Sequence, residues 1–351
     1  MNLILTYLAK HWEQLELEKY GSPAKLSCVI ATPRFRASKH VIFFILAEGH
    51  NGPLLVAKTP RLADNHESLD REARNLGLVQ SAQPHGFTSI PKVVAYEDYR
   101  GVKILFETAL SGEPFRPALV RKNPEFALQL GMSWLIEVHQ ATAQPRPAGQ
   151  NWFDENVVAP LEILRQRFSL SFEERELVDL TIQQCEPLGN LKFPSVCEHG
   201  DFSHPNILLS GKKSAAVVDW ELAEYAGLPL VDLFFFCTYV AFAERRATKT
   251  KDHLAAFQNA FFTPDTRFWQ CVSEYCGRLK LSKEAVAPLF VLCWTRYVTG
   301  LLTRIQGEGC GTDSVGNQTI SWLRSNRYYH LWRHSVERFD QLGWQKTLRS
   351  R

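Results

Sequence analysis

The chain has 351 residues, of which 45% are hydrophobic and 22% charged, as is typical of a soluble globular protein with one large domain or two closely associated lobes. Its formal net charge of only +3 gives no reason to expect a nucleic-acid partner or a membrane surface. The longest apolar candidate, residues 228–243, contains Asp232 and is too short to cross a bilayer, so no membrane span is predicted.

The N-terminus and the cysteines point to the cytoplasm. Residues 3–19 have the pattern of an amphipathic helix, without the basic region or the cleavage site of a signal peptide. None of the eight cysteines forms a CxxC pair or a Cys/His cluster with zinc spacing. We therefore expect free, buried thiols in a reducing compartment.

The first 110 residues predict a small sheet with one internal helix. A helical pattern covers residues 68–80, where leucines alternate with charged residues. Five stretches have the composition or the flanking turn residues of strands. These stretches are residues 26–31, 41–47, 54–58, 91–96 and 102–110.

After residue 110 the pattern becomes mainly helical. The strongest helix is residues 124–142, which has apolar residues at helical spacing. Further helices are expected within 153–168, 171–187 and beyond 230, and short strands at 195–198, 206–209 and 215–218. The predicted organisation is an N-terminal lobe of residues 1–110 and a C-terminal lobe of residues 111–351.

The most informative segment is residues 197–221, CEHGDFSHPNILLSGKKSAAVVDWE. Asp201 follows His-Gly, Asn206 lies five residues later, and Asp219 ends an apolar stretch. Phosphoryl transfer needs one carboxylate to orient the attacking hydroxyl, and hard oxygen ligands to hold magnesium against the phosphates. A polar loop that only turns the chain is the alternative, but it does not explain the complete pattern.

HGDFSHPN followed by VVDWE resembles the aminoglycoside phosphotransferase and choline kinase-like family, small-molecule relatives of protein kinases. The resemblance covers most of residues 25–240. It implies an α+β, protein-kinase-like two-lobe fold, with a small antiparallel β-sheet lobe containing one helix and a larger, mainly helical lobe. It also implies ATP and Mg²⁺, with Asp201 as the catalytic base, Asn206 and Asp219 as magnesium ligands, and His199 as a brace for the loop.

The same resemblance implies a lysine on the third strand and a glutamate on the following helix. Lys58 and Glu72 fit these positions, with Lys58 binding the α- and β-phosphates and Glu72 orienting it. Glu67 is the competing partner, although an acid near a helix start also favours the helix dipole. The segment around Glu107 and Ala109 resembles the hinge whose backbone binds adenine.

Three positions depart from protein kinases. The turn after the first strand has no glycine, and Arg34 and Arg36, or Ser38 with its backbone amide, are the candidates to replace glycine amides as phosphate donors; a solvated basic turn is the alternative. Ser203 stands where protein kinases place a lysine, and Glu221 stands where they place a glycine.

His139 and Asp232 are expected to be structural, and the aromatic stretches near 231–242 and 289–302 to be core.

The acceptor is expected to be a small molecule with a hydroxyl group: a sugar, a glycan intermediate or an amino alcohol. Residues 233–351 contain 17 Lys plus Arg against 9 Asp plus Glu, which disfavours a polycationic aminoglycoside. An aromatic cage for a quaternary amine would draw on the rings of this lobe. The candidates are Trp269, Trp294, Trp322, Trp332 and Tyr297. A pseudokinase-like nucleotide-binding or scaffold protein is the alternative from another class.

Overall fold

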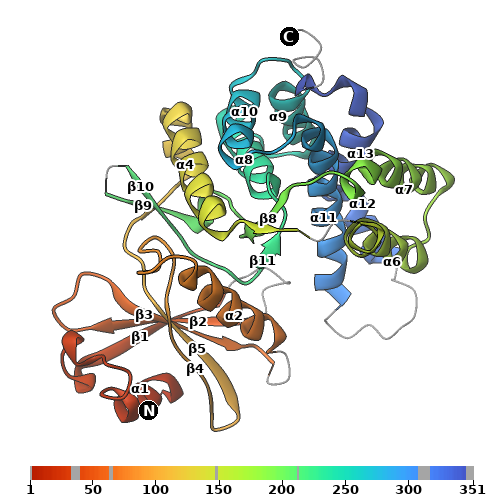
Figure 1. The fold of residues 1–351 in the computed structure, drawn as a ribbon. Helices are drawn as coiled ribbons and strands as arrows, with labels where there is room; N and C mark the ends of the chain where they lie inside the picture. The colour runs from red at the N-terminus through yellow and green to blue at the C-terminus, as the bar shows by residue number, and fades with distance from the viewer. Residues whose placement is uncertain are drawn as a thin grey trace. The chain divides into compact units, whose positions relative to one another are not determined.

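The computed structural model describes residues 2–32, 40–62, 66–146, 149–211, 213–306 and 317–344. The chain forms two compact units (Figure 1). The first contains Met1–Phe115, His199–Asp201 and Pro205–Tyr225; the second contains Arg116–Glu198, Phe202–His204 and Ala226–Arg351. Most of the segment from 199 to 225 therefore groups with the N-terminal residues, and not with the helical part of the chain that surrounds it in sequence.

A five-stranded antiparallel sheet dominates the first unit, in the order β1-β2-β3-β5-β4. Its strands are β1 (Leu26–Ala31), β2 (His40–Ala47), β3 (Pro53–Pro60), β4 (Val93–Tyr99) and β5 (Val102–Thr108). The predicted fold class, a small antiparallel sheet with a helix followed by a larger helical part, is confirmed.

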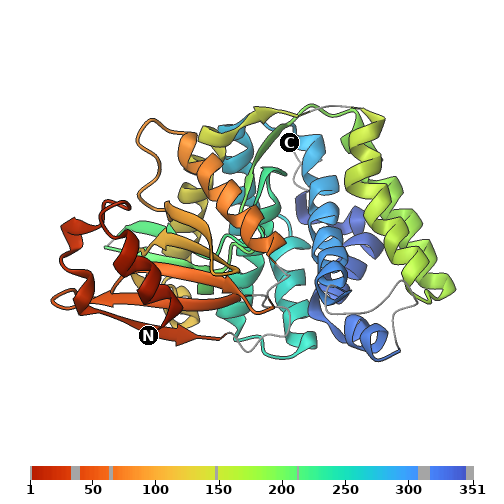
Figure 2. The same ribbon diagram turned by 90° about the horizontal axis from the view of Figure 1, so that it is seen from below.

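A different helix packs on each face of this sheet. Helix α1 (Leu3–His11) packs on one face, where Ala57 and Phe106 contribute to the buried core. Helix α2 (Glu67–Ser81) lies on the other face (Figures 1 and 2). Because side chains alternate along a strand, the neighbour Lys58 points away from the α1 core and towards α2.

A second, three-stranded sheet completes the first unit. Its order is β10-β9-β6, with β6 (Glu113–Pro114), β9 (Ile207–Ser210) and β10 (Ser214–Val217). The hairpin of β9 and β10 is antiparallel and returns the chain from Asn206 to Asp219. The amide of Val217 also donates to Ser89 O at 2.8 Å, which ties this hairpin to the residues before β4.

The second unit is mainly helical, with a small sheet in the order β11-β8-β7. The strands of this sheet are β7 (Gln144–Pro145), β8 (Pro194–Glu198) and β11 (Glu224–Gly227), of which β11 begins with the last two residues of the first unit. Its helices are α3 (Pro117–Lys122), α4 (Pro124–Thr142), α5 (Gln150–Phe153), α6 (Ala159–Arg167), α7 (Phe172–Cys185), α8 (Val231–Arg245), α9 (Thr250–Phe261), α10 (Arg267–Leu279), α11 (Val286–Gln306), α12 (Asn317–Ser325) and α13 (Arg327–Glu337). Helix α8 is buried along most of its length and packs against α3, α4, α9 and α11.

The aromatic residues of α8 and α11 belong to the core, as predicted: Phe234, Phe235 and Trp294 are fully buried. The longest apolar segment is not the predicted one. Residues Lys283–Leu302, which include most of α11, have the length and mean hydropathy of a membrane span, but 83% of the window is buried. The segment packs against α7, α8 and α13, so it is accounted for as a core helix.

The seven cysteines among the described residues are free thiols, and Cys310 lies outside the described residues. Cys237 and Cys293, on α8 and α11, are fully buried, whereas Cys28 on β1 is half-buried. Burial raises the pKa of the Cys237 and Cys293 thiols well above the ordinary value.

Candidate active site

The loop that carries Asp201 is held by His199. The Asp201 amide donates to His199 Nδ1 at 3.2 Å, so the proton of the imidazole is on Nε2, which donates to Val218 O at 3.0 Å. Gly200, between them, has φ of +79°, and a Cβ there would lie 2.5 Å from Leu222 O. Glycine is required because any side chain would strain the backbone and collide with that carbonyl. His199 thus braces the loop against the segment leading to Asp219, as expected.

Asn206 connects Asp201 to the residue that precedes Asp219. Its Nδ2 donates to the Asp201 carboxylate at 3.0 Å and to Asp201 O at 2.9 Å. Its own carbonyl oxygen accepts the amide of Val218 at 3.0 Å. Because Val218 directly precedes Asp219, these bonds fix the expected base and both expected metal ligands within one small network.

Asp219 has a strained backbone that its neighbours hold in place. Its φ is +69°, in the left-handed region that aspartate tolerates better than most residues. The Val218 amide is bonded on one side, and on the other the Trp220 amide donates to Glu72 Oε1 at 3.2 Å. Burial raises the pKa of Asp219, and the charge of Lys58 opposes that effect. An enforced conformation of this kind is typical of functional sites.

Lys58, on β3, lies between two buried carboxylates. Its Nζ donates to Glu72 Oε1 of α2 and lies 3.2 Å from Glu107 Oε1 of β5. The exposed fractions are 4% for Lys58, 0% for Glu72 and 3% for Glu107. Burial alone would lower the pKa of Lys58, but Glu107, Glu72 and Asp219 outweigh it and raise that pKa. Lys58 is therefore a buried, charged ammonium.

The competing partner of Lys58 is excluded by its position. Glu67, at the first turn of α2, is exposed, whereas Glu72 is buried against the lysine. Glu72 also accepts the amide of Trp220, so one carboxylate oxygen joins β3, α2 and the residue after Asp219.

A second link between α2 and this segment was not predicted. His40 Nε2 and Ser68 Oγ form a hydrogen bond of 2.7 Å, and His40 Nδ1 lies 3.3 Å from Glu221 Oε2. Arg71 donates to Glu221 O, and Asn75 donates to the carbonyl of Ala223. Glu221, the departure from protein kinases, therefore serves to attach the Asp-Trp-Glu segment to β2 and α2.

The donors present fit a magnesium ion. With its Nδ2 committed to Asp201, the carboxamide of Asn206 offers Oδ1, and Asp219 offers a carboxylate that accepts no hydrogen bond from the described residues. No group of three or more His, Cys, Asp or Glu in the described part of the chain forms a metal site. Mg²⁺ does not need one, because it binds through one or two carboxylates, waters and substrate phosphates.

The remaining predicted nucleotide contacts are those of the backbone at Glu107 and Ala109, which here has partners within the protein. Glu107 is paired in the sheet with Val56 of β3 and Val93 of β4, and the Ala109 amide donates to Leu54 O at 3.1 Å. The expected adenine contacts of Glu107 and Ala109 stay predictions. The carboxylate of Glu107, to which the sequence assigned no task, points at Lys58.

Arg34 and Arg36 lie outside the described residues, so their expected contact with the phosphates also stays a prediction.

His139 and Asp232 form a buried polar pair in the second unit. His139 Nδ1 bonds the hydroxyl of Tyr275 at 2.5 Å, and Nε2 lies 3.8 Å from Asp232 Oδ2. Both residues are 0% exposed, which fits the structural roles expected of them.

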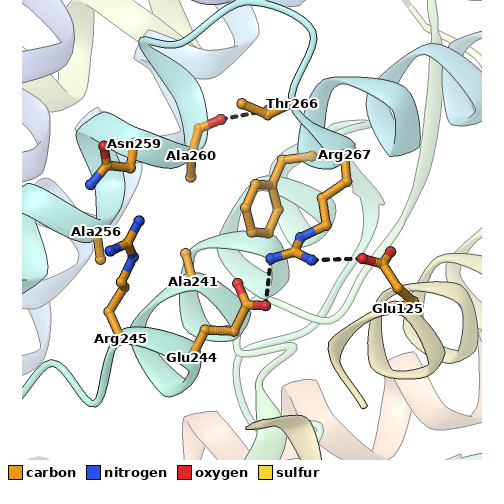
Figure 3. A pocket seen from close by; sticks show the side chains of 10 residues that line it. Glu125, Ala241, Glu244, Arg245, Ala256, Asn259, Ala260, Thr266 and Arg267 are labelled. Carbon is orange, nitrogen blue, oxygen red and sulfur yellow. Dashed lines mark hydrogen bonds and ion pairs between the residues drawn. The ribbon is translucent and has the colours of Figure 1, made fainter. Parts of the chain in front are cut away.

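A cavity of about 380 Å³ lies in the second unit, and none of the predicted site residues is among the residues that line it. It is lined by the end of α8, by α9 and by the start of α10, together with Glu125 of α4 (Figure 3). Arg267 donates to Glu125 at 2.6 Å and to Glu244 at 2.5 Å. The lining thus contains two carboxylates, of Glu125 and Glu244, and two guanidinium groups, of Arg267 and Arg245, so its formal charges cancel.

Comparison with known proteins identifies the family of the chain and several similar structures. The model of the phosphotransferase enzyme family matches residues 38–269, and no curated protein sequence matches. Choline kinase LicA from Streptococcus pneumoniae is 14% identical, with a TM-score of 0.55 over 94% of this chain and 99% of that chain. A candidate fructosamine-3-kinase from Thermobifida fusca YX-ER1 is 16% identical, with a TM-score of 0.53 over 90% and 93%.

A third similar structure is a thermostable mutant of aminoglycoside phosphotransferase APH(4)-Ia in ternary complex with AMP-PNP and hygromycin B. It is 16% identical, with a TM-score of 0.53 over 93% of this chain and 98% of that chain. At such low identity these three structures show the fold alone, while the family match covers well over half of the chain. The chain therefore belongs to the phosphotransferase enzyme family.

Proposed function

We propose that the protein transfers the γ-phosphoryl group of ATP to a hydroxyl group of a small molecule, with Mg²⁺. The observation that carries the proposal is the network in which Asn206 bonds Asp201 while its carbonyl holds the residue before Asp219. A base and two hard oxygen ligands in fixed register are what this chemistry requires. Support also comes from a similar fold that binds AMP-PNP, in APH(4)-Ia.

Each residue would have one task. The carboxylate of Asp201 accepts the proton of the acceptor hydroxyl as that oxygen attacks phosphorus and the bond to the ADP oxygen breaks. The Lys58 ammonium donates to phosphate oxygens, and Glu72 keeps it in place. Asn206 and Asp219 would hold Mg²⁺, which neutralises phosphate charge when bound. Positioning and electrostatics together lower the barrier.

The acceptor we propose is a neutral or anionic hydroxyl compound, such as a sugar or a glycan intermediate. His204 stands three residues after Asp201, and in the second unit its ring centroid lies 5.7 Å from that of Tyr239. The hydroxyls of Tyr239 and Tyr328 are 2.8 Å apart, and the Arg327 guanidinium lies over both rings, at 5.7 and 5.5 Å. Hydroxyl and guanidinium groups suit an acceptor rich in hydroxyls.

The charge of this cluster disfavours a cationic acceptor. Burial lowers the pKa of His204, and the positive charge of Arg327 lowers it further, so a second cation is unfavourable beside it. The aromatic cage considered for a quaternary amine loses most of its candidates. Trp269, Trp294 and Trp332 are at most 2% exposed and have no face to offer.

The test is release of ADP with a panel of acceptors, with and without Mg²⁺. The panel contains hexoses, a hexose phosphate, choline and an aminoglycoside, and the product is identified by the mass of one added phosphate group. We expect turnover with a neutral or anionic hydroxyl compound that requires Mg²⁺ and is lost in Asp201→Asn. Preference for choline or the aminoglycoside would refute the acceptor class, and nucleotide binding without turnover on any acceptor would favour a binding protein.

A further inference from the structure

The side chain of Glu107 lies on the face of the five-stranded sheet that also carries the side chain of Lys58. In the register of β3 and β5, Lys58 faces Leu105 and Val56 faces Glu107. Residues directly opposite in an antiparallel pair share a face, and so do alternate residues of one strand. Lys58 and Glu107 therefore emerge on the same side of the sheet, on neighbouring strands and two positions apart.

The contacts of Glu107 are few and its side chain is buried. Its Oε1 lies 3.2 Å from Lys58 Nζ, and its Oε2 is buried without a hydrogen-bond partner in the described residues. Glu72 is in the same condition, with Oε1 bonded to Lys58 and Oε2 without a partner. Two carboxylates thus share one ammonium, although one would neutralise it. Because burying a carboxylate beyond the one that the ammonium neutralises is costly, burial raises the pKa of Glu107 to about 7 although Lys58 opposes this, and the second carboxylate calls for an explanation.

The lysine has a limited number of donors for its substrate. An ammonium has three N–H groups, and here Glu72 and Glu107 engage two of them. In its ionised form, Glu107 also adds a negative charge beside the ammonium that would meet the triphosphate. Both effects weaken the binding of phosphate oxygens by Lys58.

We propose that Glu107 is a positioning residue that acts through Lys58 and limits how tightly the enzyme holds the phosphates of its nucleotide. The inference rests on the proposed function, in which Lys58 binds those phosphates. Its effect applies to ADP as well as to ATP, since the lysine contacts phosphates that both nucleotides carry. Glu107 thereby favours release of the product nucleotide at the expense of affinity for the substrate.

The two carboxylates are expected to respond in opposite directions, which separates this role from its rivals. Removing the charge of Glu72 leaves Lys58 without its main anchor, so the KM for ATP rises. Removing the charge of Glu107 leaves that anchor in place and frees a donor, so the KM for ATP falls. A second anchor like Glu72 would give a rise in both variants, and a purely structural residue would change stability without changing KM.

The experiment compares Glu107→Gln with the parent and with Glu97→Gln, an exposed glutamate of β4 in the same sheet. We expect Glu107→Gln to lower the KM for ATP and the Kd for ADP about fivefold, with kcat changed less than about twofold. The Kd for adenosine, which has no phosphates, stays at the parent value. An unchanged or raised KM, or an equal shift for adenosine, overturns the inference.

A second variant covers the case in which Glu107→Gln does not fold. Glu107→Leu fills similar volume without a polar group, and it is expected to lower the Kd for ADP in the same direction. The parent protein separates the two levels of the argument. If the parent binds no nucleotide, the proposed function fails. If the parent binds ATP and both variants match it, the role of Glu107 alone is refuted.

Discussion

The carboxylate of Glu72 accepts the backbone amide of Trp220 at 3.2 Å. Through the same oxygen it also accepts the Lys58 ammonium. The position of the lysine is thereby coupled to the backbone next to Asp219, so a change at α2 reaches both the phosphate-binding group and the expected metal ligand.

We predict that Lys58 and Glu72 act as one unit in catalysis. Lys58→Met and Glu72→Gln are each expected to lower kcat/KM by on the order of a hundredfold, and the double variant by little more, because each loss removes the same interaction. The measurement is a double-mutant cycle on ATP turnover, with the exposed Glu67→Gln as the control. Fully additive losses would show that the two residues act independently.

Asp201 is expected to affect chemistry and not nucleotide binding. Asp201→Asn keeps the shape of the side chain but removes the base, so kcat is expected to fall by about a hundredfold to ten-thousandfold. The thermal shift caused by ATP is expected to stay as in the parent. Asp179→Asn, at an exposed site on α7, is the matched control. Turnover at a tenth of the parent rate would remove Asp201 from the mechanism.

Asp219 is expected to control the magnesium dependence of nucleotide binding. Asp219→Asn replaces a carboxylate with a neutral oxygen ligand, which Mg²⁺ prefers less. A titration of Mg²⁺ at fixed ATP, followed by the melting temperature, is expected to give a higher midpoint in the variant than in the parent. A parent that melts at the same temperature with ATP whether or not Mg²⁺ is present would contradict the metal role.

The stability of the second unit is expected to depend on the charge of Glu174. This residue is 6% exposed, completes the capping box of α7 with Ser171, and accepts bonds from Arg324 and Tyr329. Although burial opposes them, these bonds lower the pKa of Glu174 to about 2. Its stabilising effect is therefore complete above the unfolded pKa of about 4.3. It is lost as the pH falls towards 2.

Glu174→Gln should accordingly cost on the order of 2–3 kcal/mol of unfolding free energy at pH 7. The difference from the parent should shrink as the pH is lowered from 5 to 3, which urea unfolding at several pH values measures. Glu173→Gln, whose side chain is 74% exposed, changes a neighbouring carboxylate without these bonds and should match the parent. A difference that is independent of pH would mean that the charge of Glu174 is not involved.

Local patterns predicted much of the fold. The bounds of β1 and α4 match the expectation, because the β-branched composition of a strand and the helical spacing of apolar residues are properties of short segments. The first helix is shorter than its pattern, which continues to residue 19. It ends at His11, and Trp12 and Leu17 turn into the core instead, with Trp12 Nε1 bonded to Gly21 O. Here tertiary packing overrides helical propensity.

The site was only partly accessible from sequence. Asp201, Asn206 and Asp219 were found because one short segment contains all three. The links from Glu107 to Lys58 and from His40 to Glu221 join distant parts of the chain, and strand register decides them. No local pattern contains that information, since a shift of one residue would turn each side chain to the other face.

Because Cys237 and Cys293 are buried, the rate at which their thiols are labelled reports local opening of the protein. A thiolate is the form that reacts with alkylating reagents, and these two thiols are both inaccessible and held protonated. They can be labelled only when α8 or α11 opens, whereas the half-buried Cys28 of β1 is accessible without opening. Labelling rates at Cys237 and Cys293, read by mass spectrometry, therefore measure the opening of the second unit without an introduced probe, and Cys28 serves as the accessible reference.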